Sequence, residues 1–320
     1  MRLLITGGAG FIGSNFIRYW NNKYPKDKIF NLDKLTYAAN RKNLENLSNP
    51  QNHKLIVGDI CNKDLVDKLV DDVDTIVHFA TESHVDNSIK SPEEFLQTNV
   101  LGTFTMLNAA TKHKKRIHHV STDEVFGSLK LKSQEKFSEK TPYDPRSPYS
   151  ASKASSDHLA RAFHHTFGTE VTISNCSNNY GPYQHIEKFI PLFVTNLMQD
   201  KKVPLYGDGL NVRDWIHVDD HCLAIETILL KGKIGESYCI GGGAEKSNKE
   251  ITYKILDLMG KDKSYIEFVE DRKGHDRRYA LDFSKIKNEL GFRPKMDFDK
   301  GLKQTVYWYK GNEDWWMHQS

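Results

Sequence analysis

The chain has 320 residues, of which 27% are charged and 38% are hydrophobic, and its formal net charge is +3. This length is enough to bury a large core, and the charge is too balanced to favour a nucleic-acid or membrane surface. No apolar run approaches the ~20 residues that a membrane span requires. Four cysteines without C-x-x-C spacing, and no secretory signal, predict reduced thiols in a cytoplasmic protein.

The first half of the chain alternates short apolar runs with helical segments, which is the pattern of β-α-β units in a parallel sheet. Strands are predicted at residues 3–5, 29–32, 54–57, 75–79 and 117–120. Helices are predicted at residues 11–22, 64–70 and 92–113, and another begins near Tyr149. A polar segment with prolines, residues 133–148, is predicted to be a loop that frames an active site. The expected fold class is α/β, with a Rossmann-type doubly wound parallel sheet.

A glycine-rich turn joins the first predicted strand to the first predicted helix. Gly7, Gly10 and Gly13 form a G-x-x-G-x-x-G pattern, which permits a tight turn and a close approach of the backbone to a pyrophosphate at the helix N-terminus. Asp33 ends the second strand and is placed to accept hydrogen bonds from an adenine-ribose diol and to repel a 2′-phosphate. The pattern predicts NAD rather than NADP, and the alternative is a turn that only caps a helix.

Two further strand ends face the same predicted crevice, because ligands of open α/β sheets bind outside the carboxyl ends of the strands. Asp59 and Ile60 follow the third strand and could reach the adenine. Phe79, Ala80 and Thr81 lie at the end of the fourth strand. From position alone, an ordinary loop explains these residues nearly as well.

Tyr149 and Lys153 are four residues apart and therefore share one face of a predicted helix. A nearby ammonium and the positive nicotinamide would lower the pKa of the phenol, so that Tyr149 could take a proton from a hydroxyl while hydride leaves the same carbon. Lys153 could also hold the nicotinamide ribose. This spacing is common on solvated helix surfaces, and the preceding dinucleotide pattern is what favours a redox acid/base pair.

Thr122, Asp123 and Glu124 follow the fifth predicted strand, where the ligand crevice is expected. The threonine hydroxyl could bind the oxygen that is oxidised, and an acid and a base could share the elimination of water from neighbouring carbons. The alternative is that the two carboxylates only begin a helix, where the helix dipole favours them.

The second half of the chain is less regular, with glycine-rich turns at residues 207–209 and 241–243. We expect residues 1–176 to form mainly an NAD-binding Rossmann domain. Residues 177–320 are expected to form mainly a smaller substrate-binding domain that is interleaved with the first. No internal repeat is evident.

Taken together, these motifs resemble the extended short-chain dehydrogenase/reductase superfamily and, within it, the dTDP-glucose 4,6-dehydratases. The glycine-rich and Tyr/Lys motifs identify only the superfamily, whereas Thr122-Asp123-Glu124 points to the dehydratases. The similarity extends over nearly the whole chain and rests on residues 6–14, 82–86, 121–127, 149–154, 177–184, 206–209, 211–215 and 274–279.

The resemblance implies a redox-neutral conversion of dTDP-glucose to dTDP-4-keto-6-deoxyglucose and water, within nucleotide-sugar metabolism such as dTDP-rhamnose biosynthesis. Tyr149 would deprotonate the C4 hydroxyl as hydride passes to NAD. Glu124 would remove the C5 proton while Asp123 protonates the departing C6 hydroxyl, after which hydride returns to C6 and C5 is reprotonated. Thr122 and Lys153 complete the implied catalytic set.

The resemblance also implies binding roles for residues that no pattern singles out. The implied cofactor contacts are Gly7, Gly10, Phe11, Ile12, Gly13, Asp33, Lys34, Leu35, Thr36, Asp59, Ile60, Phe79, Ala80, Thr81, Ser83, Thr98, Tyr149, Lys153 and Asn179. The implied sugar contacts are Ser83, Thr122 and Asn178. The implied nucleotide and diphosphate contacts are Lys188, Phe189, Pro204, Leu205, Tyr206, Arg213, Asn248, Asp271, Arg272 and His275. A homodimer is implied through the helix that carries Tyr149 and the helix at residues 92–113.

Three residues depart from the family pattern: Phe126 replaces a tyrosine, Asn87 an arginine and Lys273 a proline. None of them removes a proposed catalytic group, so the departures bear on packing and substrate contact.

Other features do not predict a site. His217 and His221 lack the further ligands of a metal centre, and no metal is expected. Trp308, Trp315 and Trp316 are expected to be packing residues.

Two other functions remain open. A nucleotide-sugar 4-epimerase would share the fold, the cofactor and the Tyr/Lys pair but would not need the acid pair. A catalytically silent NAD-binding regulatory protein would share only the fold. The patterns themselves do not separate thymidine from uridine nucleotides.

Overall fold

The computed structural model describes residues 1–317, and its central layer is a seven-stranded sheet in the order β10-β6-β5-β4-β1-β2-β3. All pairings in this sheet are parallel. The strands are β1 (Arg2–Thr6), β2 (Lys28–Asp33), β3 (His53–Val57), β4 (Thr75–His78), β5 (Arg116–Thr122), β6 (Val171–Cys176) and β10 (Ser237–Ile240). The five strands predicted in the first half are present, and the predicted doubly wound α/β fold is confirmed.

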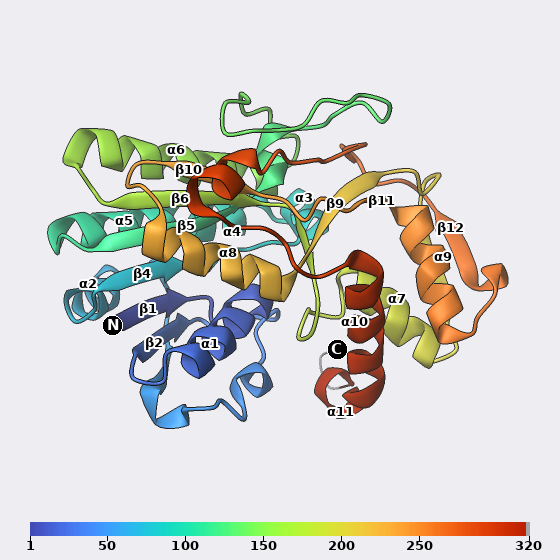
Figure 1. Ribbon diagram of the computed structural model, residues 1–320, viewed down its shortest axis with the longest axis horizontal. Helices are drawn as coiled ribbons and strands as arrows, with labels where there is room; N and C mark the ends of the chain where they lie inside the picture. The colour runs from blue at the N-terminus through green and yellow to red at the C-terminus, as the bar shows by residue number, and fades with distance from the viewer. Residues whose placement is uncertain (318–320) are drawn as a thin grey trace.

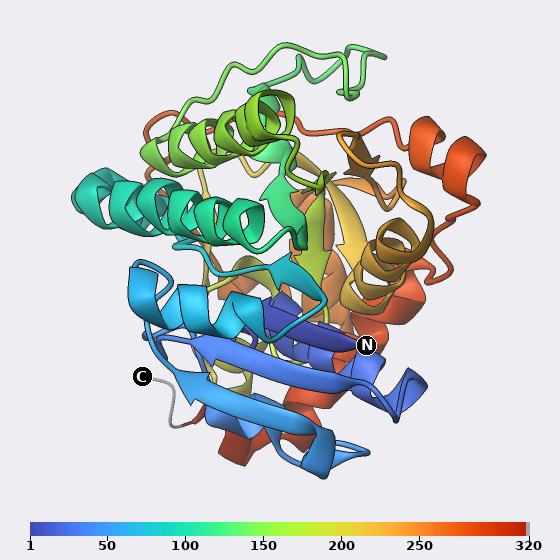
Figure 2. The ribbon, with the colours of Figure 1, turned by 90° about the vertical axis from the view of Figure 1, so that its left-hand side faces the viewer.

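Helices cover both faces of this sheet (Figures 1 and 2). One face packs against α2 (Lys63–Asp71), α5 (Thr103–Lys112) and α6 (Pro148–Phe167). The other packs against α1 (Phe11–Lys23) and α8 (Val218–Lys231). In β1 the buried side chains alternate between the two faces. Leu4 packs in the cluster that contains α2, α5 and α6, and Leu3 and Ile5 pack in the cluster that contains α1 and α8. This period of two is what buries both faces of a parallel sheet.

The helix predicted at residues 92–113 is present but its middle is widened. It runs through α4 (Pro92–Phe95), a π-helical stretch η3 (Leu96–Gly102) and α5. The short helix α3 (Val85–Lys90) precedes it. Within η3, Asn99 bonds Thr81 Oγ1, the backbone of Glu82 and Ser152 Oγ. These bonds connect the widened turn to the end of β4 and to α6, and no local periodicity predicted them.

The remaining elements build a smaller body beside the sheet, at the right of Figure 1. A three-stranded sheet contains β7 (Asn178–Tyr180), β9 (Val212–His217) and β11 (Glu245–Ser247), and a two-stranded sheet contains β8 (Val203–Tyr206) and β12 (Ile266–Val269). The helices of this body are α7 (Phe189–Met198), α9 (Asn248–Met259), α10 (Phe298–Gly311) and α11 (Glu313–Trp316).

Short helical turns occur in both parts of the described chain. They are η1 (Arg41–Leu44), η2 (Pro50–Asn52), η4 (Asp123–Phe126), η5 (Lys263–Tyr265) and η6 (Ile286–Leu290).

The C-terminal tryptophans pack in the core of this body, as predicted. Trp315 and Trp316 are buried there, and Trp308 packs partly buried against the same cluster. Trp315 also donates a hydrogen bond to Asn43 Oδ1 at 2.8 Å, which joins the end of the chain to the segment after β2.

Both β10 and α8 come from beyond residue 176 and complete the large sheet and its helical layer, so the two parts of the chain are interleaved in space. Within residues 1–317, no helix is both long and apolar enough to cross a membrane.

Candidate active site

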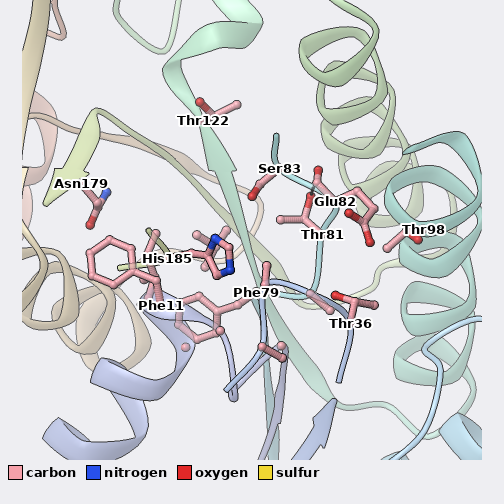
Figure 3. Close-up of a pocket in the computed structure, with 18 of the residues that line it drawn as sticks. Phe11, Thr36, Phe79, Thr81, Glu82, Ser83, Thr98, Thr122, Asn179 and His185 are labelled. Atoms are coloured by element: carbon pink, nitrogen blue, oxygen red, sulfur yellow. Dashed lines mark hydrogen bonds between the residues drawn. The ribbon is translucent and has the colours of Figure 1, made fainter. Parts of the chain in front are cut away.

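A cavity of about 310 Å³ lies at the carboxyl ends of the central strands. Figure 3 shows Thr122 and Ser83 toward one end of it and Phe11, Phe79 and Thr36 toward the other. Every predicted cofactor residue except Leu35 lines this cavity, as do all five predicted catalytic residues. Among the predicted substrate residues, those that line it are Ser83, Thr122, Asn178 and Lys188.

The glycine-rich turn brings the backbone close to the end of β4. Gly7 has φ +71°, and a Cβ at this position would lie 2.7 Å from the backbone of Ala80. A Cβ at Gly13 would lie 2.3 Å from the carbonyl oxygen of Gly7. In the described part of the chain no side chain caps α1 at Gly10, so the first N–H groups of this helix are available to an anion. The turn fits a dinucleotide pyrophosphate.

Asp33 is fixed by the turn that it faces. Its Oδ2 accepts a hydrogen bond from Ala9 N and its Oδ1 one from Leu35 N, both at 2.8 Å. Leu35 adopts a left-handed backbone conformation, with φ 56°, and contributes its backbone N–H to this turn. Burial raises the pKa of Asp33, while the two backbone hydrogen bonds oppose this shift. Beside it, Lys34 pairs with Asp59 at 2.8 Å, which closes the edge of the cavity expected to hold adenosine.

Tyr149 and Lys153 lie in the first turns of α6, which a capping box between Ser147 and Ser150 begins. Lys153 Nζ donates to the carbonyl of Val120 at 2.9 Å, and burial lowers the pKa of Lys153 to about 8. Burial, and then the charge of Glu124, raises the pKa of Tyr149, although a hydrogen bond with the Thr122 side chain opposes this.

The expectation that Lys153 lowers the pKa of Tyr149 is therefore not met by the protein alone. The ammonium is directed to the carbonyl of Val120, and burial of the phenol dominates. Any net lowering has to come from a positive charge brought by a ligand.

Asp123 and Glu124 begin η4, with Thr122 as the N-cap that accepts a hydrogen bond from Glu124 N at 3.2 Å. The two carboxylates therefore do begin a helix, as the alternative interpretation expected, and they also line the cavity. Burial, together with the charges of Glu124 and Asp214, raises the pKa of Asp123 well above its usual value. Its Oδ2 is buried and has no partner among the described residues. A carboxyl group in this setting keeps its proton and is suited to act as an acid.

Glu124 has a different environment. Burial raises the pKa of Glu124, but the charges of Arg213 and Arg272 oppose the shift. Burial thus raises the pKa of both carboxyl groups, but the opposing positive charges are the next largest influence on Glu124 and only a lesser one on Asp123, and such a difference between neighbours suits an acid and a base.

Of the residues predicted to hold the nucleotide and its diphosphate, only Lys188 lines the cavity, and Arg213, Arg272 and His275 lie outside its lining. Arg213 donates to the carbonyls of Val212 and Asp276, at 2.8 and 3.0 Å, and stacks on Tyr279. Arg272 lies over the ring of Tyr206 and donates to Asp86 in α3 at 2.7 Å.

His275 is held through Asp271, because its Nδ1 lies 2.6 Å from Asp271 Oδ1. Tyr206 meets the His275 ring edge-on at 6.2 Å. Since Arg272 also lies over Tyr206, the structure brings these four predicted residues into one cluster.

Four other predicted substrate residues are placed differently. Leu205 is buried in β8 and Phe189 packs on Phe193, so their side chains belong to the core. Asn248 begins α9, and its backbone N–H donates to Asn211 O at 2.9 Å. Pro204 precedes Leu205 in β8, where it pairs with β12.

The cavity also contains polar residues that were not predicted. Glu82 follows β4, Cys176 ends β6, and Gln184, His185 and Glu187 follow β7. Their placement after strand ends is a signal that sequence reasoning could have used for Glu82 and Cys176. The segment after β7 could not be assigned in this way, because β7 belongs to the smaller sheet.

The loop predicted at residues 133–148 does not line the cavity, which corrects the expectation that it frames the site. It packs behind the site instead, where Tyr143 donates to Asp157 in α6 at 2.8 Å. Phe126 packs on this loop, stacked on Phe137 at 5.3 Å and edge-on to Tyr143 at 5.2 Å. An additional hydroxyl at position 126 is therefore not required for this packing.

The two other departures from the family pattern, and the two histidines weighed as metal ligands, are placed as follows. Asn87 donates to Tyr37 OH at 3.2 Å, and Lys273 is exposed. His221 Nδ1 lies 2.9 Å from Asn179 Oδ1, and the His217 ring packs edge-on against Tyr180.

Comparisons with known proteins agree with this geometry. The sequence model of a family described as GDP-mannose 4,6 dehydratase matches residues 4–305. A dTDP-glucose 4,6-dehydratase of Mycobacterium tuberculosis is 51% identical over 317 residues, which cover 99% of this chain and 95% of the relative.

Solved structures of dehydratases and of epimerases share this fold but differ in how similar their sequences are to this chain. DesIV, a dTDP-glucose 4,6-dehydratase of Streptomyces venezuelae with NAD bound, has a TM-score of 0.97 and 51% identity, covering 100% of both chains. A UDP-glucose 4-epimerase of Thermotoga maritima has a TM-score of 0.90 at only 26% identity, covering 98% of this chain and 100% of the other. The fold is common to both, whereas the sequence is much nearer to the dehydratase.

Proposed function

The chain belongs to the dTDP-glucose 4,6-dehydratases of the GDP-mannose 4,6 dehydratase family, and from this we propose that it removes water from dTDP-glucose to give dTDP-4-keto-6-deoxyglucose. It is an NAD-dependent hydro-lyase. The observation that carries the proposal is that buried Asp123 and half-buried Glu124 line the same cavity as Tyr149, because an epimerase needs no acid and base for elimination.

The cavity fits NAD in three respects. Gly7 and Gly13 leave room that a Cβ would fill, the N-terminus of α1 is uncapped within the described chain, and Asp33 is fixed at the end of β2. Bound NAD would supply the hydride acceptor for C4 and the hydride donor for C6, and a positive charge that would lower the pKa of Tyr149. The carboxylate of Asp33 selects NAD over NADP by repelling a 2′-phosphate.

The residues of the chain then handle the protons. Thr122 holds the C4 oxygen and Tyr149 takes its proton, while Lys153 keeps a positive charge nearby. Oxidation at C4 makes the C5 hydrogen acidic. Glu124 removes that proton, since Arg213 and Arg272 favour its ionised form, and protonated Asp123 gives its proton to the departing C6 oxygen. Once C6 has received hydride, C5 is reprotonated, which completes the 4-keto-6-deoxy product.

We assign the remaining contacts by position. Ser83 and Asn178 line the cavity near Thr122 and bind the sugar. Arg213, Arg272 and His275 lie beyond Glu124 and bind the diphosphate, for which the arginine fork is suited. Residues 1–176 thus bind mainly NAD and residues 177–320 mainly the nucleotide.

The direct test is mass spectrometry of the products after incubation with dTDP-glucose and, separately, UDP-glucose. Loss of water from dTDP-glucose supports the proposal, and preference for dTDP-glucose assigns thymidine. An unchanged mass with an altered sugar would indicate a 4-epimerase. No reaction by NAD-containing protein would indicate a silent NAD-binding protein.

We further propose a homodimer formed through η3, α5 and α6. Leu96, Leu101 and Phe104 of the long helix and Phe167 of α6 are exposed apolar side chains. A face of this kind on packed neighbouring helices is typical of a subunit interface. The four unpaired cysteines, all within the described residues, support a cytoplasmic location, and the product suits deoxysugar synthesis such as that of dTDP-rhamnose.

A further inference from the structure

Asp157 is a fully buried carboxylate that the proposed proton transfers do not use. It lies on α6 one turn after Lys153. Its Oδ2 accepts hydrogen bonds from Ser121 Oγ at 2.9 Å, Tyr143 OH at 2.8 Å and Asn175 Nδ2 at 3.0 Å. Its Oδ1 lies 3.1 Å from His119 Nε2. Burying a carboxylate costs free energy, and this one is held by partners from three separate segments.

These partners connect the catalytic helix to the catalytic strand. Ser121 precedes Thr122 at the end of β5, and Asn175 of β6 also donates to the carbonyl of Thr122 at 3.2 Å. Asp157 thus links α6, which carries Tyr149 and Lys153, to the backbone that carries Thr122. A shift of this carboxylate would change the distance between the hydroxyl-binding and proton-accepting groups.

The same carboxylate is a negative charge beside a buried ammonium. Burial alone would raise the pKa of Asp157, but the nearby His119, the charge of Lys153 and the hydrogen bond from Ser121 hold it below its usual value. For Lys153, burial lowers the pKa, and the charge of Asp157 is the main opposing influence, followed by Cys176 of β6.

The other groups around Asp157 offer no second negative charge of this kind. On β5, His119 is buried and its pKa is lowered, first by burial and then by Lys153. On α6, Arg161 donates to Tyr143 OH at 2.8 Å. Burial raises the pKa of Tyr143, so this phenol stays neutral.

The hydrogen bonds by themselves do not require a charge. All three donors meet Oδ2, and the carbonyl oxygen of an asparagine, which has the same shape, could still accept hydrogen bonds from them, although weaker ones. What an asparagine would not supply is the negative charge near Lys153.

We propose that Asp157 is a positioning residue of the active site, whose buried negative charge keeps Lys153 in its ammonium form and whose hydrogen bonds fix α6 against the end of β5. This inference rests on the proposed function and adds to it a group that acts through Lys153. The Asp157 side chain does not line the cavity, so its effect on substrate and cofactor is indirect.

The test compares wild type with Asp157→Asn in the rate of C4 oxidation between pH 6 and 9. Asp157 follows Lys153 by one helical turn, and an opposite charge close to a buried ammonium shifts its pKa by about one unit or more. If the pKa of Lys153 falls by about one unit from about 8, the wild-type rate exceeds that of the variant about fivefold at pH 8. The ratio should be close to one at pH 6 and approach about tenfold at high pH. A purely structural defect would give a ratio that is independent of pH.

Tyr143→Phe is the matched control, because it removes one hydrogen bond from Asp157 and leaves the charge in place. Its ratio to wild type should not vary with pH. Bound NAD content and the thermal midpoint report whether each variant is folded. Asp157→Ser, which is smaller and also uncharged, provides a second variant, and Asp220→Asn controls for the loss of a buried carboxylate elsewhere.

A second measurement does not depend on turnover. Amine-reactive reagents modify only neutral lysine, so the labelling of Lys153 against pH, followed by peptide mass spectrometry, reports its pKa directly. We expect the midpoint to move to lower pH in Asp157→Asn. An unchanged midpoint, or folding failure of both Asp157 variants while Asp220→Asn folds, would overturn the inference. A wild type that labels as expected but dehydrates no substrate would instead refute the proposed function.

Discussion

Changing Asp123→Asn and Glu124→Gln together should separate oxidation at C4 from the loss of water. In the proposed mechanism Asp123, which is almost fully buried and has a raised pKa, is the acid, and Glu124, where the charges of Arg213 and Arg272 oppose the rise in pKa that burial causes, is the base. The double variant lacks both the proton donor for the C6 oxygen and the acceptor for the C5 hydrogen. It retains Tyr149, Lys153 and the glycine-rich turn.

The size of the effect follows from these roles. A general acid or base contributes about 10²–10⁴-fold to a rate. Since the two carboxyl groups serve the same elimination, their losses should not multiply, and we expect water loss to slow about 10²–10⁴-fold in the double variant. Oxidation should be spared, because the charge of Glu124 raises the pKa of Tyr149 and its removal lowers that pKa. The pH at which Tyr149 begins to act as a base should therefore move down.

Stability gives a third measurable consequence. The folded-state pKa of each carboxyl group is raised, so the folded protein binds these protons more tightly than the unfolded chain. Their contribution to stability therefore falls as pH rises from the unfolded pKa through the folded pKa. The amides carry no such penalty, and the double variant should have a thermal midpoint at neutral pH that is not below that of wild type.

The assay is a single turnover with dTDP-glucose, following the absorbance of reduced NAD and the mass of the sugar nucleotide. In D₂O the wild type should place deuterium at C5 and retain protium from C4 at C6. The double variant should show reduced NAD without water loss. Wild-type dehydration by this variant would refute the roles of both carboxyl groups.

Three further outcomes follow from the same geometry. Tyr149→Phe should retain bound NAD and lose C4 oxidation, because only the proton acceptor is removed; undiminished reduction of NAD in a single turnover would require another base. Asp33→Asn should weaken the preference for NAD over NADP, measured by competitive binding, since the charge that repels a 2′-phosphate is gone; an unchanged preference would show that Asp33 does not select the cofactor. Leu101→Glu should reduce the molar mass measured by light scattering from dimer to monomer, because it places a charge on an exposed apolar face, whereas Leu230→Glu on α8 should not; equal masses for wild type and Leu101→Glu would exclude this interface.

Much of the fold and part of the site were determined by short-range sequence patterns. Alternating apolar residues in β1 bury both of its faces, and Gly7 and Gly13 occupy positions where a Cβ would meet the backbone. The four-residue spacing of Tyr149 and Lys153 puts both on one face of α6. Each of these features depends on neighbours within a few turns or strands, so periodicity and steric limits are sufficient to predict them.

The tertiary structure decided what depends on residues distant in the chain. The charge of Asp214 helps to raise the pKa of Asp123, whereas the charges of Arg213 and Arg272 oppose the rise in the pKa of Glu124, and the proposed roles of acid and base rest on this difference. No local pattern encodes these distances. Because a pKa depends on burial and on all nearby charges together, the division of the carboxyl groups into acid and base, like the pairing of Asp157 with His119, exists only after the chain has folded.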